Sequence, residues 1–247
     1  MKQSFKIQAA AVRTCVRTGD FTCFAHHIKD ILCRLLVSIM PKIVITGFGI
    51  FAGVSRNPTE DIINSLRVWS LPECDISCTV LVCSVELLND FILGIEKDVC
   101  GRYLLDDVLL VHLGVDSCAE SFKLETNAYN NMTFRVPDQR GFSPDLACIL
   151  PSKEFNSTLS SDLDMHKFCD ELKSDKWGVE VSSDPGRYLC NYIYYNSLQL
   201  CCDRGSISNS GMCHSIFIHV PPVDRVPLED QVAFVKLAVE SIVKSMI

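Results

Sequence analysis

The sequence has no long apolar run, no large excess of basic residues and no internal repeat. Because a membrane-spanning helix needs roughly 18 or more consecutive apolar residues, no such helix is predicted. The 23 Lys and Arg residues are outnumbered by 30 Asp and Glu, which argues against nucleic acid as the main partner. The 247 residues are 48% hydrophobic and 21% charged, which is typical of one ordinary globular domain with a sizeable core.

The 14 cysteines do not follow the pattern of a secreted disulfide scaffold. They are scattered singly through predicted strands and helices, so mostly free thiols in a reducing compartment are predicted. Three are interpreted as small core hydrophobes: Cys83, Cys148 and Cys169. A zinc site is the alternative for Cys201, Cys202, Cys213 and His214. Their spacing lacks a paired C-x-x-C motif, so no metal site is predicted.

Residues 1–40 differ in composition from the rest of the chain. They carry six basic residues against two acidic ones, followed by an apolar stretch that Arg34 interrupts. We interpret them as a poorly ordered N-terminal extension, or as upstream sequence before a start at Met40, and residues 41–247 as the folded domain. A mitochondrial presequence is the alternative. The predicted location is therefore cytoplasmic, or mitochondrial if the extension acts as a presequence.

From residue 42 onward, strand and helix patterns alternate. The β-branched run Lys42–Thr46 is typical of a buried parallel strand, and Asn57-Pro58-Thr59-Glu60 has the signals of a helix start, with the helix reaching about Trp69. Further strands are predicted over 76–85, 107–114, 121–128, 179–183 and 215–220, and further helices over 86–97, 165–173, 188–201 and 228–246. This alternation predicts an α/β fold, a single three-layer αβα domain with a mostly parallel, twisted central sheet.

Ligands of such sheets gather beyond the carboxyl ends of the strands. Cys190 follows the breaker turn Asp-Pro-Gly and is predicted in the first turn of a helix after the fifth strand. His219 is predicted at the carboxyl end of the last strand, before Val-Pro-Pro. Helix N-termini favour the thiolate form of a cysteine, and a thiolate beside an imidazole is the minimal equipment for nucleophilic catalysis.

Each candidate group also has a plainer interpretation. Cys190 could be a buried helix cysteine, His219 a core histidine, and Glu125 a surface carboxylate. The glycine-rich loop 47–53 lacks the G-x-G-x-x-G and Lys-Ser/Thr patterns of phosphate-binding loops. Its two phenylalanines, Phe48 and Phe51, are predicted to be exposed and to suit an apolar pocket.

Four segments, taken in order, resemble the pyroglutamyl peptidase I family (pyrrolidone-carboxylate peptidases). They are KIVITGFGIFAGVSRNPTE (42–60), VHLGVDSCAESFKLETNAYNN (111–131), SSDPGRYLCNYIYYNSL (182–198) and FIHVPP (217–222), with RVPDQRGFSP (135–144) as a looser fifth. The likeness spans about residues 41–247. The family usually has Pro where Ile50 stands and often Gly where Ala52 stands, so the pocket loop is expected to differ there.

The resemblance implies a cysteine omega-peptidase that hydrolyses the amide bond after an N-terminal pyroglutamyl residue. Cys190 would form a thioester, His219 would act as base and then acid, and Glu125 would orient His219. Phe48 and Phe51 would sandwich the lactam ring of the substrate. Pyroglutamyl peptides would be the substrates, no metal or organic cofactor would be required, and the oligomeric state stays open. The alternatives are a weak or inactive homologue that binds pyroglutamyl peptides, and a cysteine hydrolase with another acyl preference.

Overall fold

The computed structural model describes residues 40–51, 56–208 and 210–246. The chain divides into two units, Met1–Met40 and Pro41–Ile247, and the fold described below is that of the second. The expected extension over 1–40 and the departure at Ala52 lie outside the described residues, apart from Met40, and the extension stays a prediction. None of the described helices is both long and apolar enough to cross a membrane.

Strands and helices alternate along most of the second unit. In chain order they are β1 (Lys42–Phe48), α3 (Pro58–Leu66), β2 (Asp75–Leu81), α4 (Val85–Lys97), the π-helical segment η1 (Asp98–Arg102), β3 (Val108–Val115), β4 (Phe122–Glu125), β5 (Asn127–Tyr129), β6 (Thr158–Ser160), α5 (Met165–Leu172), β7 (Val179–Ser182), α6 (Leu189–Gly205), β8 (Cys213–Val220) and α7 (Leu228–Met246). As the sequence signals predict, Asn57 caps α3, accepting a hydrogen bond from the backbone N–H of Thr59, and Pro58 is its first residue.

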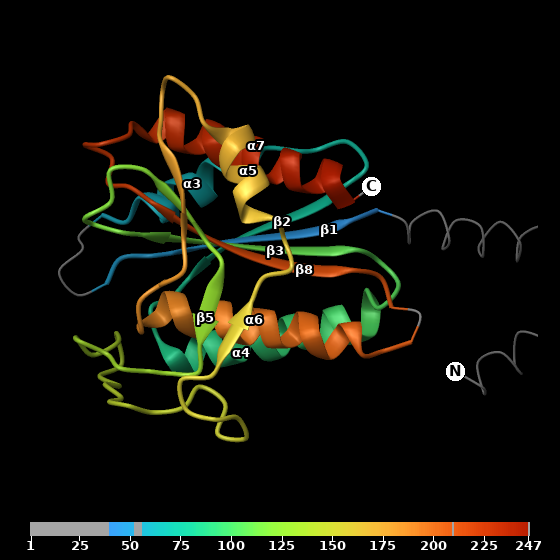
Figure 1. Cartoon of the computed structure of the whole chain (residues 1–247), viewed down its shortest axis with the longest axis vertical. Helices are drawn as coiled ribbons and strands as arrows, with labels where there is room; N and C mark the ends of the chain where they lie inside the picture. Colours follow the sequence, from blue (N-terminus) through green and yellow to red (C-terminus); the bar gives the residue numbers. More distant parts are fainter. Residues whose placement is uncertain (1–39, 52–55, 209, 247) are drawn as a thin grey trace, which may run out of the picture. The chain divides into compact units, whose positions relative to one another are not determined.

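The central sheet has the strand order β2-β1-β3-β8-β4-β7. β1 pairs in parallel with β2 and β3, and β3 pairs in parallel with β8. β4 runs antiparallel to β8 and parallel to β7, so the last two strands are reversed. Helices α3, α5 and α7 cover one face of the sheet, and α4 and α6 cover the other (Figure 1). The predicted three-layer αβα domain with a mostly parallel sheet is confirmed.

The core lies on both faces of β3 and β8, which is why these two strands occupy the middle of the sheet. Seven of the eight residues of β3 are buried, and so are the last six residues of β8. Each fully buried Leu, Ile or Val contributes about 1.5–3 kcal/mol relative to an exposed one. The site described below is therefore attached to the most deeply buried strands of the domain.

Three local expectations are wrong. The predicted strand 121–128 is divided at Thr126, whose backbone N–H donates to the carbonyl of Ser182; β4 stays in the main sheet, whereas β5 pairs with β6 in a separate two-stranded sheet. The predicted strand 76–85 ends at Leu81, because Ser84 is already the N-cap of α4. Cys83 and Cys169 are buried as expected, but Cys148 is only partly buried.

Candidate active site

A pocket of about 440 Å³ opens at the carboxyl ends of β1, β3 and β8. Its lining includes Phe48, Phe51, Cys83, Asp116, Cys190 and His219. The structure therefore brings together four residues that the sequence analysis selected from three distant segments: two phenylalanines, a thiol and an imidazole. The pocket combines an apolar wall with two groups capable of covalent and proton-transfer chemistry.

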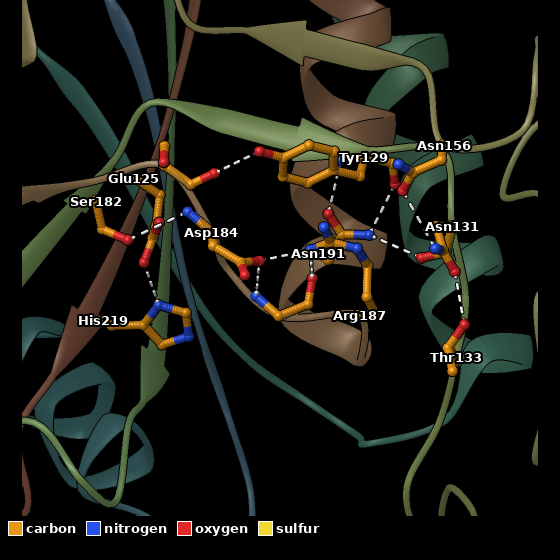
Figure 2. Close-up of polar contacts among 12 residues, drawn as sticks. Glu125, Tyr129, Asn131, Thr133, Asn156, Ser182, Asp184, Arg187, Asn191 and His219 are labelled. Carbon is orange, nitrogen blue, oxygen red and sulfur yellow. Dashed lines mark hydrogen bonds and ion pairs between the residues drawn. The ribbon is translucent and has the colours of Figure 1, made fainter.

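The fifth selected residue, Glu125, lies behind His219 and is fully buried. Its Oε1 is 2.8 Å from Nδ1 of His219 (Figure 2). The two residues come from the adjacent antiparallel strands β4 and β8, in which Lys123 is the register partner of His219 and Glu125 that of Phe217. The interpretation of Glu125 as a surface carboxylate is excluded, because its side chain is buried against the imidazole.

The charge state of His219 follows from its neighbours. Burial lowers the pKa of His219, but hydrogen bonding and charge interactions with Cys190 and Glu125 outweigh burial and raise the pKa to about 10. At neutral pH His219 is therefore an imidazolium between two groups that stabilise its positive charge. A carboxylate on Nδ1 also fixes the orientation of the ring and leaves Nε2 for chemistry.

Cys190 is the second residue of α6, in the first turn as expected. The preceding strand, β7, is antiparallel to β8, so the expectation that the thiol follows directly from the carboxyl edge of a parallel strand is wrong. The connection 183–188 returns the chain to the pocket instead. Within it, Asp184 accepts a hydrogen bond from the backbone N–H of Gly186 at 3.1 Å, and Gly186 has a φ of 79°, which favours glycine.

Gly114 provides the space in which the sulfur of Cys190 lies. A Cβ atom at this position would be 2.9 Å from Sγ of Cys190 and 2.7 Å from Cζ of Phe217. Gly114 is also the register partner of His219 between β3 and β8. Only glycine at position 114 lets the thiol of Cys190 lie this close to β3, the strand next to His219 on β8.

Asn191 attaches the first turn of α6 to the segment around β5. Its Oδ1 accepts the backbone N–H of Tyr129 at 2.8 Å, and its Nδ2 donates to the carbonyls of Tyr129 and Asn131 at 2.8 and 3.0 Å (Figure 2). The side chain is fully buried. This role of Asn191 was not predicted from the sequence, although Asn is a poor helix former and its position next to Cys190 was a signal.

The two phenylalanines line the pocket differently from what the sequence suggested. Phe48 is only 3% exposed, so its predicted exposure is wrong; it ends β1, and its backbone N–H donates to Oγ1 of Thr59 at 2.9 Å. Phe51 is partly buried, with its ring 6.2 Å from that of Tyr188. Ile50, between them, is 54% exposed.

The structure adds Asp116 to the pocket lining, a residue that the sequence analysis did not select. Its carboxylate accepts a hydrogen bond from Nζ of Lys123 at 2.8 Å. Burial raises the pKa of Asp116, but the hydrogen bonds from Lys123 and the backbone of Cys118, together with nearby positive charge, outweigh it and lower the pKa. The pocket rim therefore carries a negative charge that is already partly neutralised.

A second buried histidine, His112, lies on β3 outside the pocket. Its Nδ1 is 2.7 Å from Oγ1 of Thr46, and its Nε2 is 2.7 Å from Oγ of Ser197. Both partners are neutral hydroxyls, and burial lowers the pKa of His112 to about 3. This histidine is neutral at physiological pH and acts as a polar link between β1, β3 and α6.

The zinc site considered as an alternative for Cys201, Cys202, Cys213 and His214 is not formed by the described residues. Across residues 40–51, 56–208 and 210–246, no group of three or more His, Cys, Asp and Glu side chains is arranged to hold a metal ion. His214, one of the four candidate ligands, instead has its Nδ1 2.9 Å from Oδ1 of Asp162.

An αβα domain with a thiol, an imidazole and a buried carboxylate at one pocket has the layout of a cysteine hydrolase. Comparison with known proteins narrows this class. The family model described as pyroglutamyl peptidase matches residues 41–247, and the chain belongs to this family. The resemblance seen in the sequence is thereby confirmed.

Individual relatives agree with this assignment. The chain is 26% identical over 187 residues to the pyrrolidone-carboxylate peptidase of Pyrococcus furiosus, which covers 75% of this chain and 85% of that protein. It is 26% identical over 213 residues to pyroglutamyl-peptidase 1 of Mus musculus, covering 83% and 89%. A solved structure of a mutant pyrrolidone carboxyl peptidase from Pyrococcus furiosus has a TM-score of 0.70 at 24% identity, covering 83% of this chain and all of that one, and supports the fold.

Proposed function

We propose that this chain is a cysteine peptidase that removes an N-terminal pyroglutamyl residue from peptides. The observation that carries the proposal is the pocket in which His219, contacted at 2.8 Å by the buried Glu125, interacts with Cys190 at the start of α6. Family membership and the names of the relatives support the same reaction and the peptide substrate.

Cys190 acts as the nucleophile and His219 as the acid and base. The Cys190 thiolate attacks the pyroglutamyl carbonyl carbon, and the carbonyl electron pair moves onto oxygen. Backbone N–H groups in the first turn of α6 stabilise this oxyanion. They are open to it because the N-cap residue, Tyr188, makes no capping hydrogen bond with its side chain. When the C–N bond breaks, the imidazolium of His219 donates its proton to the leaving amine, which leaves a thioester on Cys190.

Water completes the reaction. Neutral His219 removes a proton from a water molecule, whose oxygen attacks the thioester carbonyl carbon. The C–S bond then breaks, pyroglutamate is released, and the thiolate and imidazolium are restored. Glu125 holds the ring orientation throughout and stabilises the imidazolium.

The apolar wall selects the substrate by exclusion. Phe48 and Phe51 would contact the faces of the small lactam ring, which carries no charge. An ordinary peptide N-terminus would bring a charged ammonium group against these rings, where its lost hydration is not replaced. We propose a reducing, cytoplasmic location for this reaction, because every cysteine in the described part of the chain is a free thiol.

A fluorogenic substrate, pyroglutamyl-aminomethylcoumarin, tests the assignment. The wild-type chain should hydrolyse it, and Cys190→Ala should reduce kcat/KM at least 10⁴-fold, on the order of what loss of a catalytic nucleophile costs. The control is Cys202→Ala, which removes an exposed thiol of the same helix and should retain activity. Hydrolysis that survives Cys190→Ala would refute the assigned nucleophile.

Calorimetry with a pyroglutamyl peptide separates catalysis from simple binding. Heat from turnover is expected with the wild-type chain, and binding heat alone with Cys190→Ala. Binding without turnover by the wild-type chain would contradict the proposed activity and support a binding protein. A preference for another acyl group in a panel of acyl-coumarins would identify a different hydrolase.

A further inference from the structure

Two cysteines lie in contact at the ends of α6 and β8 that are farthest from the pocket. Cys201 is near the carboxyl end of α6, and Cys213 is the first residue of β8. Their Sγ atoms are 2.9 Å apart. A disulfide bond is about 2.05 Å long, so the two sulfurs need to move together by only about 1 Å to form one. Both side chains are partly buried against a small core cluster that includes Val108, Leu110 and Leu200.

We propose that Cys201 and Cys213 form a reversible disulfide by exchange with a small-molecule disulfide such as oxidised glutathione. This site is separate from the proposed peptidase chemistry, which uses neither residue. It also gives a function to two of the cysteines, Cys201 and Cys213, for which the sequence suggested a zinc site as the alternative. Intracellular disulfides of this kind are reversible and respond to the redox state of the compartment.

The surroundings of the pair distinguish the two thiols. The hydrogen bond between the two thiols lowers the pKa of Cys213; burial opposes this change, but the positive charge of Arg204 adds to it. The same hydrogen bond, together with burial, raises the pKa of Cys201. Arg204 is fully buried, and its guanidinium donates to the carbonyls of Tyr103 and Leu104, so its charge is held in place. Cys213 is therefore the attacking thiol and Cys201 the resolving one.

The exchange proceeds in two balanced steps. The Cys213 thiolate attacks one sulfur of oxidised glutathione, an S–S bond forms, and one glutathione leaves as a thiolate that takes up a proton. Cys201 then loses its proton and attacks Sγ of Cys213, which expels the second glutathione. In total, two cysteine thiols lose two electrons and two protons, and one glutathione disulfide becomes two glutathione thiols.

The disulfide would join the two elements that carry the catalytic thiol and imidazole. Cys190 is the second residue of α6 and His219 lies near the end of β8, so the cross-link and the pocket are at opposite ends of this helix and this strand. Closing the segment between residues 201 and 213 restricts the unfolded chain. We expect the oxidised form to have a Tm about 5 °C above that of the reduced form.

The experiment uses the full chain with Cys190→Ala, so that the pocket thiol does not react and no activity is needed as a readout. The reduced protein is incubated with oxidised glutathione, quenched with acid and digested with trypsin without reduction. Because Arg204 lies between the two cysteines, cleavage after it separates them, and mass spectrometry should detect a cross-linked peptide pair two hydrogens lighter than its thiol forms. The Tm should rise in parallel.

Single substitutions identify which two cysteines form the cross-link. Cys202→Ser, which removes the exposed neighbouring thiol, should leave it unchanged. Cys201→Ser should stop at a stable mixed disulfide of Cys213 with glutathione. If both thiols remain alkylatable after treatment, or if Cys213 links to Cys202 instead, the proposal is wrong. Either result leaves the peptidase assignment unaffected, because that assignment is tested by hydrolysis.

Discussion

His112 and His219 are both buried, on the neighbouring strands β3 and β8, yet their pKa values move in opposite directions. His112 is 1% exposed and His219 is 7% exposed, so burial alone does not explain the difference. The hydroxyls of Thr46 and Ser197 leave burial unopposed at His112, whose pKa is lowered to about 3. Glu125 and Cys190 overcome burial at His219, whose pKa is raised to about 10.

The comparison shows that the charge of the neighbours, and not burial alone, sets the charge state of a buried histidine; in the proposed mechanism this charge state is what lets His219 act as the acid. A neutral imidazole held by two hydroxyls has both ring nitrogens occupied and no stabilised positive form. An imidazolium held on one nitrogen by a carboxylate keeps the other nitrogen for proton transfer. Removing the charge around His219 should therefore make it resemble His112.

Among the changes that test this comparison of the two histidines, the largest effect is expected for Glu125→Gln. This change removes the negative charge behind His219 while keeping the shape of the side chain, so the pKa of His219 should fall and its ring orientation should be lost. We expect kcat/KM for pyroglutamyl-aminomethylcoumarin to decrease by about 10³–10⁴-fold, comparable with loss of the orienting carboxylate in a serine protease triad.

The matched control is Glu180→Gln, which neutralises an exposed carboxylate on β7 of the same sheet. It should change kcat/KM less than twofold, and circular dichroism should give the same folded spectrum for both variants. If Glu125→Gln retains activity within tenfold of the wild type, the orienting role of Glu125 is wrong.

The next effect concerns the thiol, the second group that distinguishes His219 from His112. In Gly114→Ala, the added Cβ would meet Cys190 and Phe217 at distances below 3.0 Å, so the sulfur must shift away from its position. We expect a loss of about 10²-fold in kcat/KM, the cost of a displacement of the order of 1 Å.

Gly101→Ala is the control for Gly114→Ala, because a Cβ atom at that position meets nothing within 4 Å. It should leave kcat/KM unchanged. Equal losses in the two variants would indicate a general effect of removing glycine and not displacement of the thiol.

The smallest effect is on stability, and its sign differs between the two histidines. The folded-state pKa of His219 lies above the ordinary value of 6.5, so its contribution is complete below about pH 6.5 and is lost as the pH rises towards 10. The folded-state pKa of His112 lies below 6.5, so the protein loses stability as the pH falls from about 6.5 towards 3.

Urea unfolding across pH 4–10 measures both slopes. His219→Gln should flatten the alkaline decrease in the free energy of unfolding, and His112→Gln should flatten the acidic one. If both variants flatten the same side, the contrast between the two histidines does not hold.

Several features of the fold were predictable because the sequence patterns that specify them lie within short segments. The cap at Asn57, the apolar alternation of the strands and the apolar face of α7 each depend on residues close together in the sequence. The strand 121–128 was incorrectly predicted as continuous, since an alternating pattern does not reveal that a strand changes its partner at Thr126. Phe48 was predicted to be exposed because it was assigned to the glycine-rich loop 47–53, whereas it is the last residue of β1 and is buried.

By itself, the sequence determined that a thiol follows a breaker turn at a helix start, that an imidazole ends a buried strand, and that the ordered motifs are those of one family. Only the tertiary structure decided that Glu125 is buried against His219, that Gly114 makes room for Cys190, and that Cys201 meets Cys213. The physical reason is that helix starts and strand patterns arise from neighbouring residues, whereas charge, burial and contact depend on which distant segments the fold brings together: β4 beside β8, and α6 beside β3 and β8.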